Sequence, residues 1–479
     1  MAPQPAEPAP PRRRPPRASA ARLAALLALP ALIAAQAPAT AAAAAPASGA
    51  ASPLDALVRE GLAANPALRA RSYEIRRDDA AVREADGRWL PSATINARNS
   101  AVRGAVIDLG TLINPAYSAL NQLLGQQAFP TDLVLRLPLR QEATVRVQQP
   151  LLEPRILAGQ RIVRAAREAT IAGRDAARRQ LAADIRLAYL QYARAARARE
   201  ILVATVPLLD EAERVSQRLL DAGKVTPDNV LRARAERSAV VQQRDAAAQL
   251  TDAARRQVNL LVGREVDAPL PLVTDSTLGF EARFATIGDS LTLVRRALGA
   301  REELRQLDRA RDAANGQATL ARTAFLPSVG VALDYGFQGN TIRVGRGTDF
   351  TVASLVLSWN LFNGGQDRAR VEQARAEAQA IGARREDVAR QITLQVQVAE
   401  DAARVARTAI TTAGDRVASA TRTFELVQRR FAQGLASQLE LLDARTALTT
   451  AQLNLVVTTY DFYARVTELD RAAALTPTE

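Results

Sequence analysis

The sequence contains no cysteine and no histidine among its 479 residues. The lack of cysteine excludes disulfides and thiolate metal sites, and the lack of histidine removes the commonest general base and zinc ligand. The chain also has no GxxxxGK[ST] phosphate loop, no GxGxxG turn after a strand and no GxSxG nucleophile elbow. Carboxylate chemistry is left, but no segment gathers Asp and Glu into an obvious pocket. We therefore predict no enzyme activity, no catalytic residue, no cofactor and no metal.

Lysine is nearly absent as well, because Lys224 is the only one, and the net charge of +13 comes from arginine. Such an excess of positive charge normally suggests nucleic acid as a partner. Here the arginines are interleaved with Asp and Glu, as in RAAREATIAGRDAARRQLAADIR at positions 164–186. Mixed helix faces of this kind mainly keep a helix soluble, so we expect no nucleic-acid partner.

The amino terminus has the three parts of a secretory signal. A basic stretch from Arg12 to Arg17 precedes an apolar run over residues 18–35, and the small residues Ala35-Gln36-Ala37 follow. This order is typical of a signal peptide, and the run is short for a membrane anchor. We expect residues 1–37 to be a signal peptide and residues 38–53 to be a flexible Ala/Pro leader. The alternative is a disordered Arg/Pro tail on a cytoplasmic protein.

The chain contains an internal repeat at a spacing of roughly 206 to 237 residues, far longer than the periods of solenoid proteins. WLPSATINA at Trp89 recurs as FLPSVGVAL at Phe325, and RLLDAGKVTPDNVLRARAERS at Arg218 recurs as RFAQGLASQLELLDARTALTT at Arg430. Each copy reads as helix, strand, strand, long helix, glycine turn, helix. The predicted boundaries are 54–267 for the first repeat, 268–288 for a linker, 289–474 for the second repeat and 475–479 for a tail.

The strands are predicted from period-two alternation. In the second repeat one face carries Val329, Val331, Leu333, Tyr335 and Phe337, and the other carries small and polar residues. Lengths of about 10 to 14 residues suit tilted membrane strands that are apolar toward lipid and polar toward a lumen. The alternative is a soluble sheet with one buried face.

The helices are predicted from apolar spacing near 3.6 residues. Residues 160–220 and 366–432 each predict one helix about 90 to 100 Å long, with Pro207 as a candidate kink in the first. The lengths of the predicted helices over residues 68–88 and 227–262 add up to nearly the length of one long helix. We therefore expect two short helices to stack end to end beside each long one, with the strands at one end and the glycine turns at the other.

Charged residues interrupt every other long apolar stretch, so the only predicted way into a membrane is a β-barrel. Four strands are too few to close a barrel, because about eight is the practical minimum, and exposed strand edges are not tolerated in lipid. The sequence thus predicts an oligomer, and three copies would supply twelve strands.

These repeats, the LPS entry to each first strand and the stretch LELLDARTALTTAQLNL after Gly434 resemble the TolC family of outer-membrane efflux channels, from Leu54 to about Ala474. The resemblance implies a mainly α-helical fold: a homotrimer with a shared twelve-stranded β-barrel in the outer-membrane lipid and a long α-helical barrel through the periplasm. It implies a passive exit duct of a tripartite efflux or type I secretion system. A periplasmic adaptor and an inner-membrane pump would be the partners.

The resemblance also assigns roles to single residues. Gly223 and Gly434, with Lys224 and Leu435 beside them, match the periplasmic tips that contact the adaptor. The simpler explanation, which is compatible with this one, is that glycine relieves the left-handed backbone after a helix.

Glu440 and Asp443 match the two acidic positions, six and nine residues after the tip glycine, that ring the closed entrance, and Phe431 occupies a nearby aromatic position. Three copies would form two acidic rings with a preference for cations. The alternative is that carboxylates early in a helix favour its positive end. Ala436 stands where some family members have a basic gate residue, so a closing salt-bridge network is not predicted.

Two other proteins could share some of these features. A periplasmic adaptor would have one hairpin flanked by lipoyl-like and barrel strands, whereas two hairpins are predicted here. A coiled-coil scaffold would explain the helices but neither the signal nor the strands.

Finally, residues 106–137 are apolar enough to pack rather than remain in solvent, and we expect them on the extracellular side, partly capping the channel mouth.

Overall fold

The computed structural model describes residues 53–101, 107–134, 136–137, 141–339 and 348–476. The predicted signal peptide, the predicted leader up to residue 52 and residues 477–479 of the predicted tail lie outside this part of the chain. Residues 1–50 and 51–479 are separate units, and every described residue belongs to the second.

The elements follow the predicted order, with insertions. In the first half of the chain they are α1 (Pro53–Ala64), α2 (Pro66–Gly87), β1 (Ser92–Asn99), β2 (Ile107–Asp108), α3 (Gly110–Leu124), β3 (Arg136–Leu137), β4 (Gln141–Leu152), α4 (Pro154–Asp221) and α5 (Pro227–Val262). In the second half they are α6 (Asp275–Leu278), α7 (Phe280–Ala285), α8 (Ser290–Ala300), α9 (Glu302–Arg322), the 3-10 turn η1 (Thr323–Phe325), β5 (Ser328–Gly339), β6 (Asp349–Ser358), α10 (Gln366–Ala432) and α11 (Gln438–Ala473).

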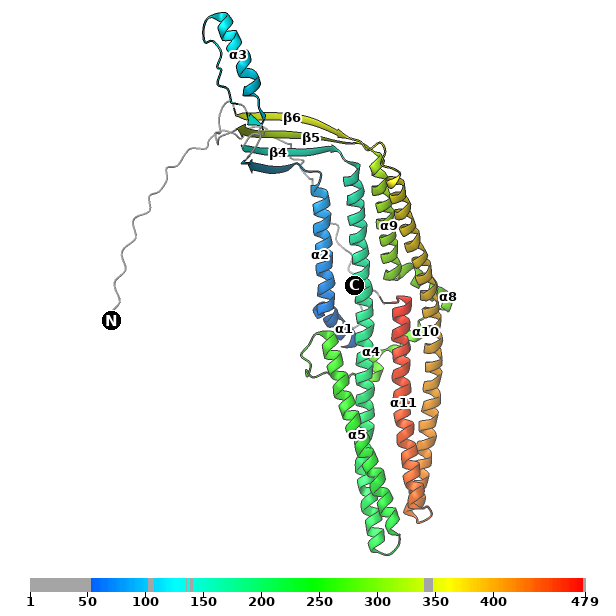
Figure 1. Ribbon diagram of the computed structural model, residues 1–479. Helices are drawn as coiled ribbons and strands as arrows, with labels where there is room; N and C mark the ends of the chain where they lie inside the picture. Colours follow the sequence, from blue (N-terminus) through cyan, green and yellow to red (C-terminus); the bar gives the residue numbers. More distant parts are fainter. Residues whose placement is uncertain (1–52, 102–106, 135, 138–140, 340–347, 477–479) are drawn as a thin grey trace, which may run out of the picture. The chain divides into compact units, whose positions relative to one another are not determined.

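Two long helical hairpins, α4–α5 and α10–α11, dominate the described residues (Figure 1). The long helices α4 and α10 contain 68 and 67 residues, which at 1.5 Å per residue is about 100 Å each. α4 begins six residues earlier than predicted, because Pro154 suits a first helical position and the Glu153 side chain accepts a hydrogen bond from the Arg155 amide. Helix lies on both sides of Pro207, the predicted site of a kink.

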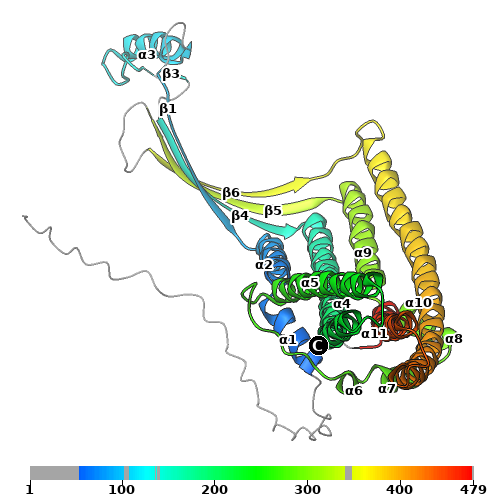
Figure 2. The same ribbon diagram turned by 90° about the horizontal axis from the view of Figure 1, so that it is seen from below.

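Short helices pack along each long one. α2 and α5 both lie along α4, and α9 and α11 both lie along α10 (Figures 1 and 2). This is the arrangement expected from the match between the helix lengths. α4 also packs against α9 and α11, so contacts between the first and second halves of the chain hold the two hairpins together.

One antiparallel sheet has the strand order β1-β4-β5-β6. Its central pair, β4 and β5, comes from different halves of the chain and places Val145 opposite Tyr335 and Val147 opposite Leu333. β1 and β6 are the edges, and neither outer edge pairs with another of the described strands. A register shift near Pro150 bends β4 just before it leads into α4.

The two faces of this sheet differ in chemistry and in burial. On β5, Leu333 and Tyr335 are exposed, whereas Ala332 and Gly336, which alternate with them, are buried. The exposed apolar face continues onto β6, where Leu355 is 71% and Leu357 is 64% accessible. The opposite face carries polar and small residues on β5, and on β6 it carries Ser354 together with Phe350, Val352 and Val356. A soluble sheet would bury its apolar face, so the burial pattern favours the lipid-facing alternative.

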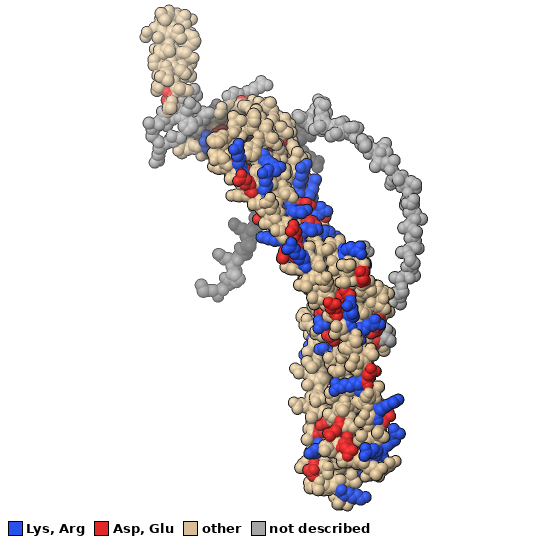
Figure 3. Space-filling view, turned by 90° about the vertical axis from the view of Figure 1, so that its right-hand side faces the viewer, with Lys and Arg blue, Asp and Glu red and all other residues tan. Residues whose placement is uncertain are grey.

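Charged residues of both signs are mixed along the helices, as Figure 3 shows for one face of the molecule. Many of them form ion pairs within a helix or between neighbouring helices, such as Arg71–Glu74 within α2 and Arg164–Asp86 between α4 and α2. These exposed pairs contribute about 0–1 kcal/mol each and mainly keep the helices soluble.

The main hydrophobic core lies where α1, α4, α5, α7, α8, α10 and α11 meet, and it includes Ile185, Phe462 and Val466, which are fully buried. The predicted linker, residues 268–288, packs on this core. The hydroxyls of Tyr189 and Tyr192 on α4 donate hydrogen bonds to the backbone oxygens of Pro271 and Leu270, at 3.2 and 2.8 Å. These bonds tie the linker to the middle of α4.

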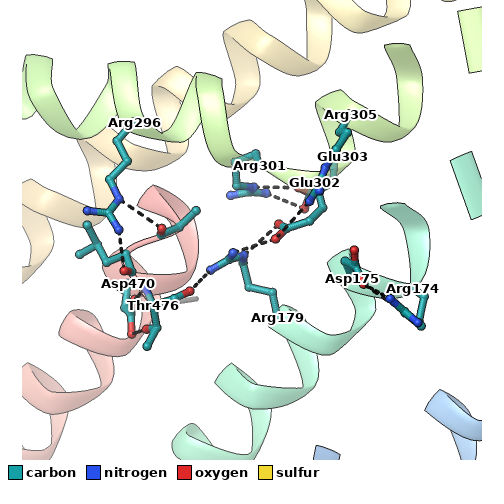
Figure 4. Close-up of polar contacts among 12 residues, drawn as sticks. Arg174, Asp175, Arg179, Arg296, Arg301, Glu302, Glu303, Arg305, Asp470 and Thr476 are labelled. Atoms are coloured by element: carbon teal, nitrogen blue, oxygen red, sulfur yellow. Dashed lines mark hydrogen bonds and ion pairs between the residues drawn. The ribbon is translucent and has the colours of Figure 1, made fainter. Parts of the chain in front are cut away.

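A cluster of buried ion pairs lies beside this core (Figure 4). Arg179 on α4 binds both oxygens of Glu302 at the start of α9, with distances of 2.9 and 2.7 Å, and Glu302 is almost fully buried. The same guanidinium donates to the backbone oxygen of Thr476 at 2.7 Å, and Asp470 accepts the Thr476 amide at 2.8 Å. The cluster therefore joins the first long helix, the second half of the chain and its carboxy-terminal end.

The apolar segment 106–137 contains a helix that the sequence analysis did not predict. α3 is followed by an extended return, and the short strands β2 and β3 pair at its base. Residues 106, 135 and the link 138–140 lie outside the described part of the chain.

No helix among the described residues is long and apolar enough to cross a membrane. The described residues also contain no cluster of acidic side chains suited to hold a metal ion.

Candidate functional site

The turns that end α4 and α10 have the same backbone structure. Gly223 and Gly434 have φ angles of 67° and 73°, a left-handed conformation that favours glycine. After α4, the amides of Gly223 and Lys224 donate to the oxygens of Leu220 and Leu219, both at 2.8 Å. After α10, the amides of Gly434 and Leu435 donate to Phe431 and Arg430 at 3.0 and 2.8 Å. Both turns are therefore Schellman motifs, and the helix-capping role of the two glycines is confirmed.

Both turns present their side chains to solvent. A Cβ atom at Gly223 or Gly434 would meet no atom within 4 Å, so the glycines are required by backbone angle and not by crowding. Lys224 is exposed, and Leu435 is 64% accessible. Lysine at one turn and leucine at the other give the two hairpin ends different chemistry.

Glu440 is part of the helix cap that begins α11. The Glu440 amide donates to the Ser437 hydroxyl at 3.2 Å, and the Ser437 amide donates to the Glu440 carboxylate at 3.1 Å, which together form a capping box. The Ser437 amide and hydroxyl, with Arg430 nearby, lower the pKa of the Glu440 carboxyl below its ordinary value. The structure therefore shows Glu440 stabilising the start of a helix, which is the alternative explanation for an acid at this position.

Asp443 lies one turn further along α11 and is exposed. It forms no hydrogen bond or ion pair within the described chain. Residues three apart share one helix face, so Glu440 and Asp443 present two carboxylates to solvent from successive turns. A role in helix capping is compatible with a role for the same charges in an assembly.

Phe431 is separated from these acids. It lines a cavity of about 380 Å³ between α4, α10 and α11, together with Gln438, Leu442 and Arg445, and neither acid lines this cavity. The Arg445 guanidinium lies 5.2 Å from the centre of the Phe424 ring, and burial lowers its pKa. The structure therefore brings Phe431 into contact with the interior of the hairpin pair and leaves the acids outside.

Gln438, which the sequence analysis did not single out, links the two hairpins. It is buried in the first turn of α11, and its amide nitrogen donates to the hydroxyl of Ser216 on α4 and, at 3.3 Å, to the backbone oxygen of Asn229 on α5. Two turns further on, the Thr446 hydroxyl donates to Glu236 of α5 at 2.9 Å. These contacts hold the second hairpin against the first near the turns.

A signal for this link exists in the sequence only in retrospect. Gln438 stands at the first helical position of a segment whose later inward residues, Leu442 and Leu448, are apolar. Its partners Ser216 and Asn229 lie more than 200 positions earlier, so no local pattern connects them.

A family model described as outer membrane efflux protein matches residues 293–475. A comparison with curated protein sequences finds no match. Among solved structures, the chain is similar to the outer-membrane channel OprN, with 20% identity and a TM-score of 0.70, covering 89% of this chain and 91% of that one.

Two further solved structures have the same fold. CusC, from a study of folding and transmembrane channel formation, shares 17% identity with a TM-score of 0.73, covering 88% of this chain and 91% of that one. The CmeC outer membrane channel of Campylobacter jejuni shares 16% identity with a TM-score of 0.70, covering 88% of this chain and 85% of that one. Residues 293–475 therefore match the outer membrane efflux protein family, and the described chain has the fold of TolC-like outer-membrane channels, which confirms the resemblance seen in the sequence.

Proposed function

We propose that this protein is an outer-membrane channel that extends into the periplasm and carries cargo out of the cell as a passive conduit. The observation that carries the proposal is the sheet at one end of the hairpins. Its apolar side chains, such as Leu333 and Leu355, are exposed, while Ala332 and Gly336 on its other face are buried. In water this arrangement is unfavourable by about 25 cal/mol per Å² of exposed apolar surface, whereas lipid removes that cost.

The channel is proposed to be a homotrimer. Each protomer supplies four strands with open edges at β1 and β6, and open edges are not tolerated in lipid. Edge-to-edge pairing of three copies yields a closed barrel of twelve strands, while the hairpins of the three copies form an α-helical barrel. In this assembly the two halves of the chain act as repeats, each supplying two strands and one hairpin.

The hairpin turns are proposed as the contact surface for a periplasmic adaptor. Gly223, Lys224, Gly434 and Leu435 are exposed at the ends of the hairpins. A conduit of this kind has no energy source of its own, so an inner-membrane pump would supply it through the adaptor, in a tripartite efflux or type I secretion system. The comparisons give no support to the alternatives in which this chain is itself the adaptor or a scaffold.

The gate is proposed to lie at the start of α11. Three copies of Glu440 and Asp443 would form two acidic rings that favour cations, and Phe431 would move with the same hairpin. The contacts of Gln438 with Ser216 and Asn229 support the closed position, because they hold the second hairpin against the first. Opening then requires these hydrogen bonds to break when an adaptor engages the turns.

Single-channel recording in planar bilayers tests the proposal. The purified oligomer should show discrete, cation-selective openings, and the protein should remain in the outer-membrane fraction after a carbonate wash. A gate that stays closed would silence the wild-type channel, so the variant with Glu440→Gln and Asp443→Asn is recorded beside it. A folded protein that washes off with carbonate and is silent in both forms would contradict the channel function.

A further inference from the structure

The segment between β1 and β4 folds as a small unit of its own. Asn121 of α3 both donates to and accepts from the backbone of Phe129, at 2.6 and 2.8 Å. Two turns earlier, Asn114 does the same with the backbone of Leu133, both at 2.9 Å. The rings of Tyr117 and Phe129 lie 5.2 Å apart, centre to centre. These contacts fix one face of α3 against the return segment that follows it.

The opposite face of α3 has no partner among the described residues. Leu112 and Leu123 on this face are 72% and 84% accessible, and Ala116 and Ala119 between them are exposed. We call Leu112, Ala116, Ala119 and Leu123 the α3 stripe. Their spacings of four, three and four residues follow the heptad repeat, in which apolar positions meet an equivalent helix along a narrow seam.

The segment is also free of charge. No charged residue occurs between Asp108 and Asp132, and the end of the molecule that contains α3 in Figure 3 is almost entirely without charged side chains. A surface without charge approaches its own copies without repulsion, and the small side chains of Ala116 and Ala119 allow helices to approach closely.

We propose that the α3 stripe packs against the same stripe of neighbouring copies, so that three α3 helices form a parallel bundle over the outer mouth of the channel. This inference rests on the proposed trimer. The segment follows β1, the sheet edge that pairs with a neighbour in that trimer, so the α3 interface continues the proposed barrel interface. A threefold axis then brings three identical stripes together.

A lipid surface is the competing partner, and the composition of α3 disfavours it. Helices that lie on membranes carry Lys or Arg on their polar face and often Trp at the interface, and α3 contains none of these residues. The bundle would act as an extracellular cap and is separate from the acidic rings at the periplasmic end.

A single cysteine tests the bundle directly, because the natural chain contains none. The full-length Leu123→Cys trimer is oxidised with copper phenanthroline, and the fraction of covalent dimer is measured. We expect several-fold more dimer than for Leu124→Cys, an adjacent exposed residue outside the seam. Ala119→Cys, within the seam, should form as much dimer as Leu123→Cys. Agreement between the two positions would show that the cross-link reports on the whole stripe and not on one substitution.

Two further measurements, light scattering and fluorescence quenching, distinguish a failure of the α3 bundle from a failure of the trimer. If light scattering shows a trimer but the Leu123→Cys and Leu124→Cys variants cross-link equally, the bundle is wrong and the channel proposal stands. A fluorophore attached to the Leu123→Cys variant and quenched by nitroxide-labelled lipids in proteoliposomes would also overturn the bundle, in favour of lipid. A monomeric mass would overturn the trimer and with it both proposals.

Discussion

The side-chain amide of Gln438 donates to the backbone oxygen of Asn229 at 3.3 Å, and this contact joins the first turn of α11 to the first turn of α5. Each of these first helical turns comes shortly after the Schellman motif that ends the preceding long helix. The contact therefore ties together the ends of the two hairpins, which must separate if the proposed gate opens. Gln438 is buried, and its second bond is to Ser216 on α4.

Gln438→Leu should make the channel open more readily. The substitution removes two hydrogen bonds of about 0.5–1.5 kcal/mol each, which predicts an increase in the ratio of open to closed time of roughly fivefold to a hundredfold in single-channel records. The global stability should change little, because the Gln438 carbonyl oxygen is buried without a partner and Ser216 keeps its bond to Ala212. Gln433→Leu, at an exposed position, is the control, and an equal effect of both variants would contradict the link.

Neutralising the acids should reduce cation selectivity without unfolding α11. A glutamine side chain can still take part in a capping box, so Glu440→Gln with Asp443→Asn removes charge but keeps the helix start. We expect the reversal potential in a salt gradient to move toward zero while the circular dichroism spectrum is unchanged. Asp221→Asn, an exposed acid at the end of α4, is the matched control. Unchanged cation selectivity in the double variant would show that Glu440 and Asp443 do not form the gate.

The contribution of Glu440 to stability should depend on pH in a defined direction. Its pKa is lowered by the Ser437 hydrogen bonds, so the charged carboxylate stabilises the fold at pH above its ordinary value of 4.5. That contribution is lost as the pH falls through the lower value of the folded state. Thermal unfolding of the wild type and Glu440→Gln should differ by a constant amount from pH 7 to about 5, and the difference should shrink as the pH falls below 4.5. A difference that changes between pH 7 and 5 would contradict this assignment.

A positive charge on the exposed sheet face should prevent stable membrane insertion. Leu355→Arg places the charge on the proposed lipid face, which costs about 2–4 kcal/mol near the middle of a bilayer. Ser354→Arg places the same charge on the opposite face, and it should be tolerated. Outer-membrane yield and heat-resistant oligomer on gels provide the measurement. Equal losses of outer-membrane yield and of oligomer in Leu355→Arg and Ser354→Arg would argue against a lipid-facing surface.

Loss of the buried ion pair between Arg179 and Glu302 should destabilise the helical region strongly. Arg179→Met leaves the carboxylate of Glu302 buried without its main partner, and breaking such a pair costs about 3–5 kcal/mol. Arg88→Met breaks an exposed pair and should cost less than about 0.5 kcal/mol. Urea unfolding followed by circular dichroism compares the two, and similar midpoints would show that the cluster is not a stabilising junction.

Local patterns in the sequence determined the types of the main elements and the ends of the hairpins. The alternation around Leu333 specified a strand, the 3.6-residue spacing specified α4 and α10, and Gly223 and Gly434 specified the turns. These features depend on residues within one or two turns of each other, because backbone sterics and hydrogen bonding act at that range. For the same reason the capping role of Glu440 could be read from the sequence.

Contacts between distant residues were decided only by the tertiary structure. Alternation marks two strand faces but does not say which is exposed, and only the burial of Ala332 against the exposure of Leu333 distinguishes them. The link from Gln438 to Ser216 spans 222 positions, and the Arg179–Glu302 pair spans 123. Phe431 turned out to line a cavity between three helices, and α3 formed where only an apolar loop was expected. Packing across such separations depends on which surfaces meet in space, and a one-dimensional pattern carries no record of that.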